Sequence, residues 1–525
     1  MTYTLIPSAA YINMELAAEY GRIPPAFLPV GHSRLYELQI ESLQNGDLIF
    51  LTLPQSYIVP AFDMAFFSRK GVQLIPIPDG LTLGRSIQYA LDLIGKPSDS
   101  IRILHGDTLI PDAPLDQMDV VAVGVPPEGY EWGQFAPTKE SDSNVLAGYF
   151  VLSNPIEFRR SLTLADGSFT LALSFYSKQI ELKDIVVNTW LDFGHLQTFY
   201  RARCNIHTQR AFNELHLDFQ RIRKTAENHK KIDAESSWFR LLPDSLRLYT
   251  PAYLGSGVYE NGQPWYELEY LPLPSLHELF VFGELSSNSW KKIFQGCVQF
   301  IENCREQGQH VKNSRTIHPG GFREAIHCKT TRRLNSWLSS KGLSQDNVWS
   351  YRGQKLPSLR QIVASTAQAI GEDSSQFRSV MHGDFCFTNI FFDFRTMRIR
   401  TIDPRGGMDD DENSILGDWR YDLAKISHSL IGGYDLVLAG RYRLLETSPF
   451  DVTLDFIDAK VLYCAQEQYG AIQVDGMNPK SIQIISIVIH LFLSMIPLHA
   501  DRPDRQNAFF ANALRLYYEY FFDKS

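Results

Sequence analysis

Three polar side chains in the second half of the sequence have the spacing that phosphoryl transfer requires. Asp384 stands five residues before Asn389, and Asp403 follows Asn389 by fourteen residues. In phosphoryl transfer from ATP, one carboxylate accepts or orients the attacking hydroxyl, while an amide oxygen and a second carboxylate hold the magnesium that bridges the phosphates. The apolar runs at 390–392 and 397–402 predict two short strands that would present both metal ligands to one cleft.

A lysine and a glutamate further upstream have the spacing of an ATP-binding pair. Lys224 lies in the run 221–225, which is expected to be a strand, and Glu235 lies in 230–238, which is expected to be a helix. Such a lysine grips the α- and β-phosphates, and the helix glutamate holds the lysine in place. The segment 265–270, followed by two nearby prolines, predicts a hinge strand between two lobes.

These segments together resemble the aminoglycoside phosphotransferase/choline kinase family, whose fold is similar to that of protein kinases. The family signature H-G-D-x-x-x-x-N followed by I-D is matched in full by residues 382–389 and 402–403. The resemblance covers about residues 209–525 and implies an α+β, two-lobed kinase domain. Its N-lobe would span about 209–274 and its C-lobe about 275–525.

The same resemblance implies a role for each matching residue. Asp384 would be the catalytic base, and Asn389 and Asp403 would bind Mg²⁺. Lys224 and Glu235 would bind ATP. Two later acids, Asp418 and Asp422, match a helix start in the family and are expected to cap the helix and to hydrogen-bond the loop. No glycine-rich loop precedes the lysine, and residues 212–215 are expected to form a tight turn instead.

The tripeptide His-Gly-Asp also occurs at residues 105–107, where it has different surroundings. The residue five positions after Asp107 is Asp112, and no I-D pair follows at the kinase spacing. The first copy is therefore not expected to be a second kinase site.

This first copy belongs to another pattern. The segments 27–31, 104–107 and 190–194 resemble the sugar-phosphate nucleotidyltransferases, over about residues 1–205. In that family a Gly-Asp after a strand and a later W-x-D-x-G each give an Asp to the metal that holds the nucleotide phosphates. The resemblance implies that Asp107 and Asp192 bind this metal, and carboxylates are suitable ligands for Mg²⁺.

The nucleotidyltransferase pattern is incomplete at the loop expected to hold the triphosphate. Active members have a glycine-rich loop there, because backbone N–H groups must approach the phosphates closely. Residues 6–20 contain neither a glycine nor a basic residue. Two interpretations stay open: the domain transfers a nucleotidyl group from a second nucleoside triphosphate, CTP or UTP, or it binds a nucleotide or nucleotide-linked ligand without that reaction.

The pattern of apolar segments predicts two domains. Over the first 200 residues, strands such as 2–7, 47–53, 72–77, 101–104 and 120–125 alternate with helices, which indicates an α/β domain with a mostly parallel, Rossmann-like sheet. A surface loop is expected at 126–143. The boundary is placed at residue 208, giving a nucleotidyltransferase-like domain at 1–208 and a kinase domain at 209–525, which is mostly helical from residue 275 onward.

Composition excludes several classes of protein. The 525 residues carry 50 Lys and Arg against 59 Asp and Glu, a net charge of −9, so the basic excess that phosphate contacts give a nucleic-acid binder is absent. The apolar run 482–496 is shorter than the roughly 20 residues of a spanning helix, so we expect a buried helix and no membrane insertion. Scattered cysteines and an acidic N-terminus predict a cytoplasmic protein with reduced thiols.

Taken together, the two resemblances predict an ATP-dependent small-molecule kinase, with a sugar or amino-alcohol hydroxyl as acceptor, fused to a nucleotidyltransferase-like domain. Such a fusion points to bacterial capsule or surface-polysaccharide precursor synthesis, in which an alcohol is phosphorylated and then activated as a nucleotide conjugate. One alternative is a kinase whose N-terminal domain only binds a nucleotide or a nucleotide-sugar acceptor. A second alternative is a non-enzymatic binding or scaffold protein. Oligomeric state is left open.

Two features near Asp403 bear on the acceptor and point in opposite directions. The acidic run at 409–412 is either a solvated loop or a means of attracting a cationic substrate. Arg405, two residues after Asp403, would instead suit contact with an anionic acceptor.

Overall fold

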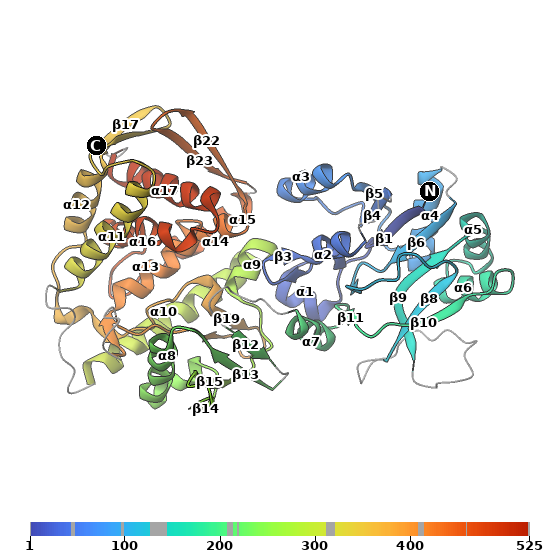
Figure 1. Cartoon of the computed structure of the whole chain (residues 1–525), viewed down its shortest axis with the longest axis horizontal. Helices are drawn as coiled ribbons and strands as arrows, with labels where there is room; N and C mark the ends of the chain where they lie inside the picture. The colour runs from blue at the N-terminus through green and yellow to red at the C-terminus, as the bar shows by residue number, and fades with distance from the viewer. Residues whose placement is uncertain are drawn as a thin grey trace. The chain divides into compact units, whose positions relative to one another are not determined.

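A computed structural model describes residues 2–43, 48–95, 99–125, 144–206, 214–217, 220–310, 321–407, 414–457 and 459–522. The chain divides into two compact units, each with its own core (Figure 1). The first unit comprises residues 1–207 and 282–284, and the second comprises 208–281 and 285–525. The expected loop at 126–143 and the acidic run at 409–412 lie outside the described residues.

The first unit is built on a seven-stranded sheet with the order β10-β8-β9-β6-β1-β4-β5. Its strands are β1 (Thr2–Pro7), β4 (Leu48–Pro54), β5 (Gln73–Ile77), β6 (Ser100–Leu104), β8 (Val120–Gly124), β9 (Val145–Leu152) and β10 (Lys183–Val186). All neighbours in the sheet are parallel except β9, which runs antiparallel to both β6 and β8. The five predicted strands are present, whereas β9 and β10 were not predicted.

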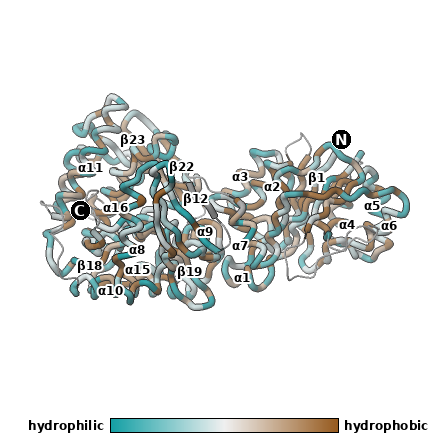
Figure 2. Tube along the Cα trace, turned by 60° about the horizontal axis from the view of Figure 1, so that its bottom comes forward, coloured by the Kyte–Doolittle hydropathy of each residue, from teal (hydrophilic) through white to brown (hydrophobic). Residues whose placement is uncertain are grey.

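Helices surround this sheet, as the alternating pattern predicted. They are α1 (Met14–Tyr20), α2 (Leu35–Ser42), α3 (Ala61–Lys70), α4 (Leu83–Ile94), α5 (Pro155–Leu164), α6 (Phe169–Ser177) and α7 (Leu196–Asn205). Consecutive side chains of β6 are all buried, as in sheets covered on both faces. Ile87 of α4, Phe158 of α5 and Leu173 of α6 pack into one hydrophobic cluster with the strands. Figure 2 shows hydrophobic residues concentrated along the central strands around β1.

Short strand pairs complete the first unit. They are β2 (Pro29–Val30) with β3 (Ser33–Arg34), and β7 (Thr108–Leu109) with β11 (Leu191–Asp192). The second pair is antiparallel and sets Asp192 opposite Thr108, the residue after Asp107. A tertiary pairing between segments more than eighty residues apart thus brings the two predicted metal ligands together.

The second unit begins with an antiparallel sheet of order β12-β13-β15-β14. Its strands are β12 (Glu214–Leu217), β13 (Arg221–Thr225), β14 (Tyr253–Val258) and β15 (Pro264–Glu269), and α8 (His229–Leu241) lies beside them (Figure 1). The predicted strand with Lys224, the helix with Glu235 and the strand at 265–270 are all present. The expected turn at 212–215 is wrong in part, because residues 214 and 215 pair with β13 as strand β12.

The remainder of the second unit is mainly helical. Its helices are α9 (Leu276–Phe282), α10 (Ser287–His310), α11 (Gly321–Ser340), α12 (Leu359–Ala369), α13 (Trp419–Leu430), α14 (Tyr434–Leu438), α15 (Ala459–Gly470), α16 (Ile482–Met495) and α17 (Pro503–Tyr517). Among the described residues, only the segment 482–499 is long and apolar enough to cross a membrane, and 67% of it is buried. It packs among α11, α12, α13 and α17 as a core helix.

Several strands interrupt this helical part. Two short antiparallel pairs are β18 (Arg378–Val380) with β21 (Leu416–Asp418), and β19 (Ile390–Asp393) with β20 (Arg398–Thr401), the second pair having been predicted. The sequence did not predict a further sheet of four strands, which are β16 (Val348–Tyr351), β17 (Gln354–Ser358), β22 (Tyr442–Ser448) and β23 (Asp451–Phe456). The fold class is nevertheless as expected: an α/β unit followed by an α+β unit with a small antiparallel sheet and a large helical part.

Candidate functional site

The loop between β18 and β19 carries the His-Gly-Asp motif and is fixed through its backbone. The amides of His382 and Gly383 donate to the two carboxylate oxygens of Asp422, at 2.7 and 2.8 Å. In turn, the amides of Arg405 and Gly406 donate to the carbonyl of His382. Buried amides paired in this way hold the loop in one conformation. The expected loop-bonding role of Asp422 is confirmed, and Asp418 caps α13 by accepting from the Arg420 amide.

Gly383 is required at its position by two independent features. Its φ of +77° is left-handed, a conformation that other residues adopt at a cost. A Cβ added there would lie 2.4 Å from the carbonyl oxygen of Gly406. The close approach of these two loops sets the backbone on either side of Asp384.

His382 is a buried positioning residue. Its Nδ1 accepts from the Asp384 amide at 3.2 Å, so its Nε2 carries the proton and donates to Thr401 Oγ1 at 2.6 Å. Burial lowers the pKa of His382 to about 4, which keeps the ring neutral at physiological pH. The imidazole therefore ties the loop to β20 without adding a charge.

Asp384 lies between two cations. Lys425 Nζ is 2.8 Å from its Oδ1, and Arg405 Nε is 3.2 Å from its Oδ2. Burial would raise the pKa of Asp384, but the two positive charges outweigh that effect and hold the pKa well below its ordinary value. Asp384 is therefore a stable carboxylate throughout the physiological pH range.

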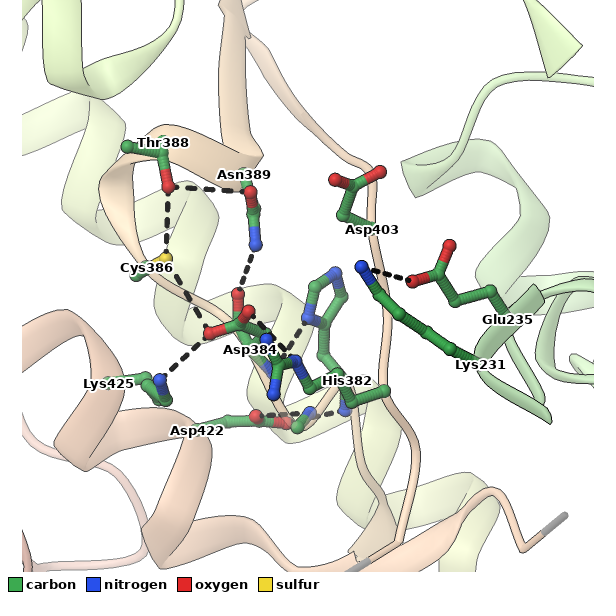
Figure 3. A network of polar contacts seen from close by, with 12 residues as sticks. Lys231, Glu235, His382, Asp384, Cys386, Thr388, Asn389, Asp403, Asp422 and Lys425 are labelled. Carbon is green, nitrogen blue, oxygen red and sulfur yellow. Dashed lines mark hydrogen bonds and ion pairs between the residues drawn. The ribbon is translucent and has the colours of Figure 1, made fainter. Parts of the chain in front are cut away.

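Asn389 and Asp403 lie on the same side of Asp384 (Figure 3). The Asn389 side chain donates from Nδ2 to the Asp384 carbonyl at 2.9 Å, which fixes the orientation of its amide oxygen. Asp403 has a left-handed φ of +56°, a conformation that is uncommon outside glycine and concentrated at functional sites. The antiparallel pairing of β19 with β20 brings both residues to the same end of this hairpin.

Lys224 forms ion pairs with two acids from different segments of the second unit. Its Nζ is 2.7 Å from Glu235 Oε2 and 2.9 Å from Asp403 Oδ1. Burial would lower the pKa of Lys224, but the two carboxylates raise it overall, so the amine stays charged. Tyr266 on β15 donates to the same Glu235 oxygen at 2.7 Å. Lys224, Glu235 and Asp403 thus form one ion-paired cluster, and Asp384 and Asn389 form a separate hydrogen-bonded pair beside Asp403 (Figure 3).

The residues suit a magnesium ion held jointly with a nucleotide. An amide oxygen from Asn389 and a carboxylate from Asp403 are hard oxygen ligands, oriented by the Asp384 carbonyl and by Lys224. Magnesium is usually bound by one or two carboxylates together with substrate phosphates, not by a full protein cage. The described residues contain no group of three His, Cys, Asp or Glu side chains placed to bind a metal.

Sequence reasoning missed Lys425 and Lys231. Lys425 stands three residues after Asp422 on α13, so helical periodicity places both on the face toward the loop. That spacing was the available signal. Lys231 lies on α8, and its Nζ is 3.8 Å from Glu235 Oε1 (Figure 3).

A separate site in the first unit contains Asp107 and Asp192. Both carboxylates lie against Gly194, where an added Cβ would be 2.7 Å from Asp107 Oδ2 and 3.4 Å from Asp192 Oδ1. Burial and the charge of Asp192 raise the pKa of Asp107. His195 Nδ1 is 3.3 Å from Asp192 Oδ2, and this hydrogen bond raises the pKa of the imidazole. A carboxyl with a raised pKa beside a second carboxylate is a group that a bound cation would stabilise in its charged form.

The segment after β1, where nucleotidyltransferases have their glycine-rich loop, is held by side chains. Ser8 accepts from the Ala26 amide at 3.0 Å, and its own amide donates to Thr52. Tyr11 hydrogen-bonds Ser56, and the Arg22 guanidinium lies over the Tyr11 ring at 4.0 Å. Asn13 caps α1 and also donates to the carbonyl of Gly194. Through Asn13 this segment is thus hydrogen-bonded to Gly194, against which the two carboxylates lie. It has no glycine that would let its backbone approach phosphates closely.

Comparison with known proteins gives matches at the level of solved structures. No protein-family model matches the chain, and no curated protein matches it significantly. A Bacillus anthracis protein described as a glucose-1-phosphate thymidylyltransferase is 13% identical over 40% of this chain and 97% of its own, with a TM-score of 0.32.

Aminoglycoside phosphotransferases form the other group of similar structures. The GDP complex of wild-type aminoglycoside 2'-phosphotransferase-IIIa is 10% identical over 60% of this chain and 92% of its own, with a TM-score of 0.38. An aminoglycoside-3'-phosphotransferase of type VIII is 12% identical over 54% and 96%, with a TM-score of 0.30. Both families that the sequence motifs resemble are represented among the structures similar to this chain.

Proposed function

We propose that the protein is an ATP-dependent kinase that phosphorylates a hydroxyl group of a small molecule. The observation that carries this proposal is the position of Lys224, whose amine lies between Glu235 and Asp403, with Asp403 and Asn389 on the same side of Asp384 (Figure 3). A lysine held by a helix glutamate next to a metal-binding aspartate is the arrangement that binds and aligns ATP phosphates.

The reaction follows from these positions. The acceptor hydroxyl oxygen forms a bond to the γ-phosphorus of ATP while the bond from that phosphorus to the β,γ-bridging oxygen breaks. ADP leaves with that oxygen, and the hydroxyl proton passes to Asp384 and from there to solvent. Asp384 accepts a hydrogen bond from the hydroxyl and aims its lone pair at the phosphorus. A strongly basic carboxylate is not needed, because the transition state is loose and the proton leaves late.

The remaining residues bind and orient the nucleotide. Lys224 contacts the α- and β-phosphates, and Glu235 with Tyr266 keeps the amine in position. Asn389 and Asp403 would hold Mg²⁺, which would supply positive charge to neutralise the phosphates.

Replacement of the base tests the proposal. Asp384→Asn removes the group that orients the hydroxyl, so the rate of phosphoryl transfer should fall by about 10²–10⁴, the usual contribution of such a group. ADP release with a panel of alcohols, together with the mass of the product, measures the effect. Asp346→Asn is the matched control, since Asp346 is an exposed acid paired with Arg360 away from this network. Unchanged turnover in Asp384→Asn would contradict the assignment.

A second activity is proposed for the first unit. The convergence of Asp107 and Asp192 on Gly194 favours a divalent cation, and with it a nucleotide, there. The side-chain-filled segment 8–13 favours the alternative in which the unit binds a nucleotide or nucleotide sugar without nucleotidyl transfer. Pyrophosphate release from CTP or UTP with sugar phosphates, lost in Asp107→Ala, would support the catalytic form. Nucleotide binding without pyrophosphate release would support the other.

The biosynthetic role of the protein is also a proposal. A kinase fused to a nucleotidyltransferase-like unit suits the synthesis of nucleotide-activated precursors, such as those of bacterial capsule or surface polysaccharide, in the cytoplasm. The proposed substrate is a small molecule. Nucleic-acid and membrane partners of the protein are not expected, in keeping with its net charge of −9 and with the core packing of α16. A non-enzymatic scaffold role is the remaining alternative, and ATP-dependent turnover would exclude it.

A further inference from the structure

The charges around Asp384 are unusual for a site that takes a cationic acceptor. Arg405 and Lys425 each contact one oxygen of the carboxylate. Within the described parts of the chain, neither cation forms an ion pair with another carboxylate. Among the described residues, Asp384 is thus paired with two cations, so two positive charges lie against its one negative charge.

Lys425 is placed differently from the lysine that serves the nucleotide. Lys224 already pairs with Glu235 and Asp403, the acids on the nucleotide side. Lys425 lies on the opposite side of Asp384 from Asp403 and Glu235 (Figure 3). Since the base separates the two sets of groups, Lys425 faces the side from which the acceptor approaches.

Both cations keep hydrogen-bonding capacity for a ligand. Only Nε of the Arg405 guanidinium is used on Asp384, and 57% of this side chain is exposed. Guanidinium groups present further N–H donors in a planar fork that matches carboxylate and phosphate oxygens, and an ammonium group has three donors. Lys425 is 16% exposed, so an anion that reached it would be largely shielded from solvent.

We propose, on the basis of the kinase function above, that the acceptor is an anionic alcohol whose carboxylate or phosphate binds Arg405 and Lys425 while its hydroxyl hydrogen-bonds Asp384. A sugar phosphate and a sugar acid share the required chemistry. On this proposal amino sugars and amino alcohols, which carry an ammonium group, are not preferred acceptors, because Arg405 and Lys425 repel an ammonium group.

The test compares matched acceptors: one sugar in its neutral, 6-phosphorylated, uronic-acid and 2-amino forms, each with Mg-ATP. We expect kcat/KM for an anionic form to exceed that for the neutral form by about tenfold or more, and the amino form to be poorest. The phosphate and uronic-acid arms distinguish the two sources of negative charge. A preference for the amino form, or equal rates for all forms, would overturn the proposal.

Variants that each remove one positive charge test whether Arg405 and Lys425 cause the preference for anionic acceptors. Arg405→Gln and Lys425→Gln should each reduce the anionic-over-neutral ratio by about tenfold, chiefly through KM. Arg352→Gln, which removes an arginine paired with Asp455 outside the site, should leave the ratio unchanged. If the Gln variants lower kcat equally for every acceptor, the cations serve the transferred phosphoryl group and the proposal is wrong.

The outcomes separate this inference from the proposed function. Transfer to the neutral or amino form with no preference for anions would leave the kinase function intact and overturn only the acceptor class. Absence of ADP formation with every acceptor, in a protein whose melting temperature is also unaffected by Mg-ATP, would overturn both.

Discussion

At the scale of single residues, charge is concentrated around one carboxylate and one amine. Asp384 contacts two cations, and Lys224 contacts two carboxylates. Each buried charge is therefore compensated, which is the condition under which such groups remain ionised. The consequence is a site in which protonation states are fixed by neighbours, and catalysis depends on position more than on proton affinity.

The depressed pKa of Asp384 predicts how stability responds to acid. A carboxyl whose pKa is lower in the folded state than its ordinary 3.8 binds fewer protons when folded, so its stabilising contribution is present above that value and is lost as pH falls toward the folded pKa. Between about pH 5 and pH 3, the urea midpoint of the wild type should fall more steeply than that of Asp384→Asn.

Tryptophan fluorescence is a suitable measurement, because Trp238, Trp290 and Trp419 are buried in the second unit. Equal slopes of the midpoint against pH in the two proteins would show that Asp384 does not titrate abnormally. Asp346→Asn again serves as the control for removing a carboxylate.

The pairing of Glu235 with Lys224 predicts a nucleotide effect. Glu235→Gln keeps the shape but removes one of the two charges that hold the amine, so kcat/KM for ATP should fall by about 10²-fold through misplacement of the phosphates. Steady-state kinetics with varied ATP measures the loss. Glu269→Gln on β15, which removes an acid paired with Arg400, should have little effect. A defect confined to the KM of the acceptor would contradict the assignment of Lys224 to ATP.

At the scale of elements, the site is assembled by short connections between the strands of the second unit. The loop after β18 and the segment after β20 approach each other through Gly383 and Gly406, and α13 fixes the first of them through Asp422. A close approach of this kind allows no side chain between the two backbones. The position of Asp384 therefore depends on glycine as much as on the polar residues.

Gly383→Ala tests this dependence. Gly353→Ala is the control for the backbone conformation. Both glycines have a left-handed φ, +77° and +75°, but an added Cβ meets a carbonyl at Gly383 and nothing within 4 Å at Gly353. We expect Gly353→Ala to cost about 1 kcal/mol, from the backbone conformation alone. Gly383→Ala should cost about 1–3 kcal/mol more and should also reduce phosphoryl transfer. Similar losses in the two variants would show that the close approach is unimportant.

At the scale of the whole molecule, two units with separate cores occur in one chain. The first is organised around the sheet strands and the second around helices such as α16. Since residues in different cores share no packing partners, their effects on stability should be additive.

Core truncations therefore should act on one unit at a time. Ile103→Ala in β6 and Leu493→Ala in α16 each remove a buried side chain, with an expected cost of about 2–5 kcal/mol for the unit that contains it. Scanning calorimetry should show one transition lowered by each variant, and Ile103→Ala should keep ATP turnover at 25 °C. A single transition that both variants lower equally would show that the units unfold together.

The sequence by itself determined the motifs and the local elements around them. Regular spacing predicted β13, α8, β15, β19 and β20, because strand and helix periodicity are properties of neighbouring residues. The same local signals gave Lys224, Glu235, Asp384, Asn389 and Asp403 as a set.

Only the tertiary structure decided what these residues contact. The pairing of β16 with β23 joins segments about a hundred residues apart, and no periodicity in either segment reveals the partner. For the same reason, the contact of Lys425 with Asp384 was not predicted, although Asp384 stood in a recognised motif and Lys425 directly follows another. Burial, pairing and charge balance are relations between distant segments, so the contacts of Asp384 with two cations became visible only in the folded chain.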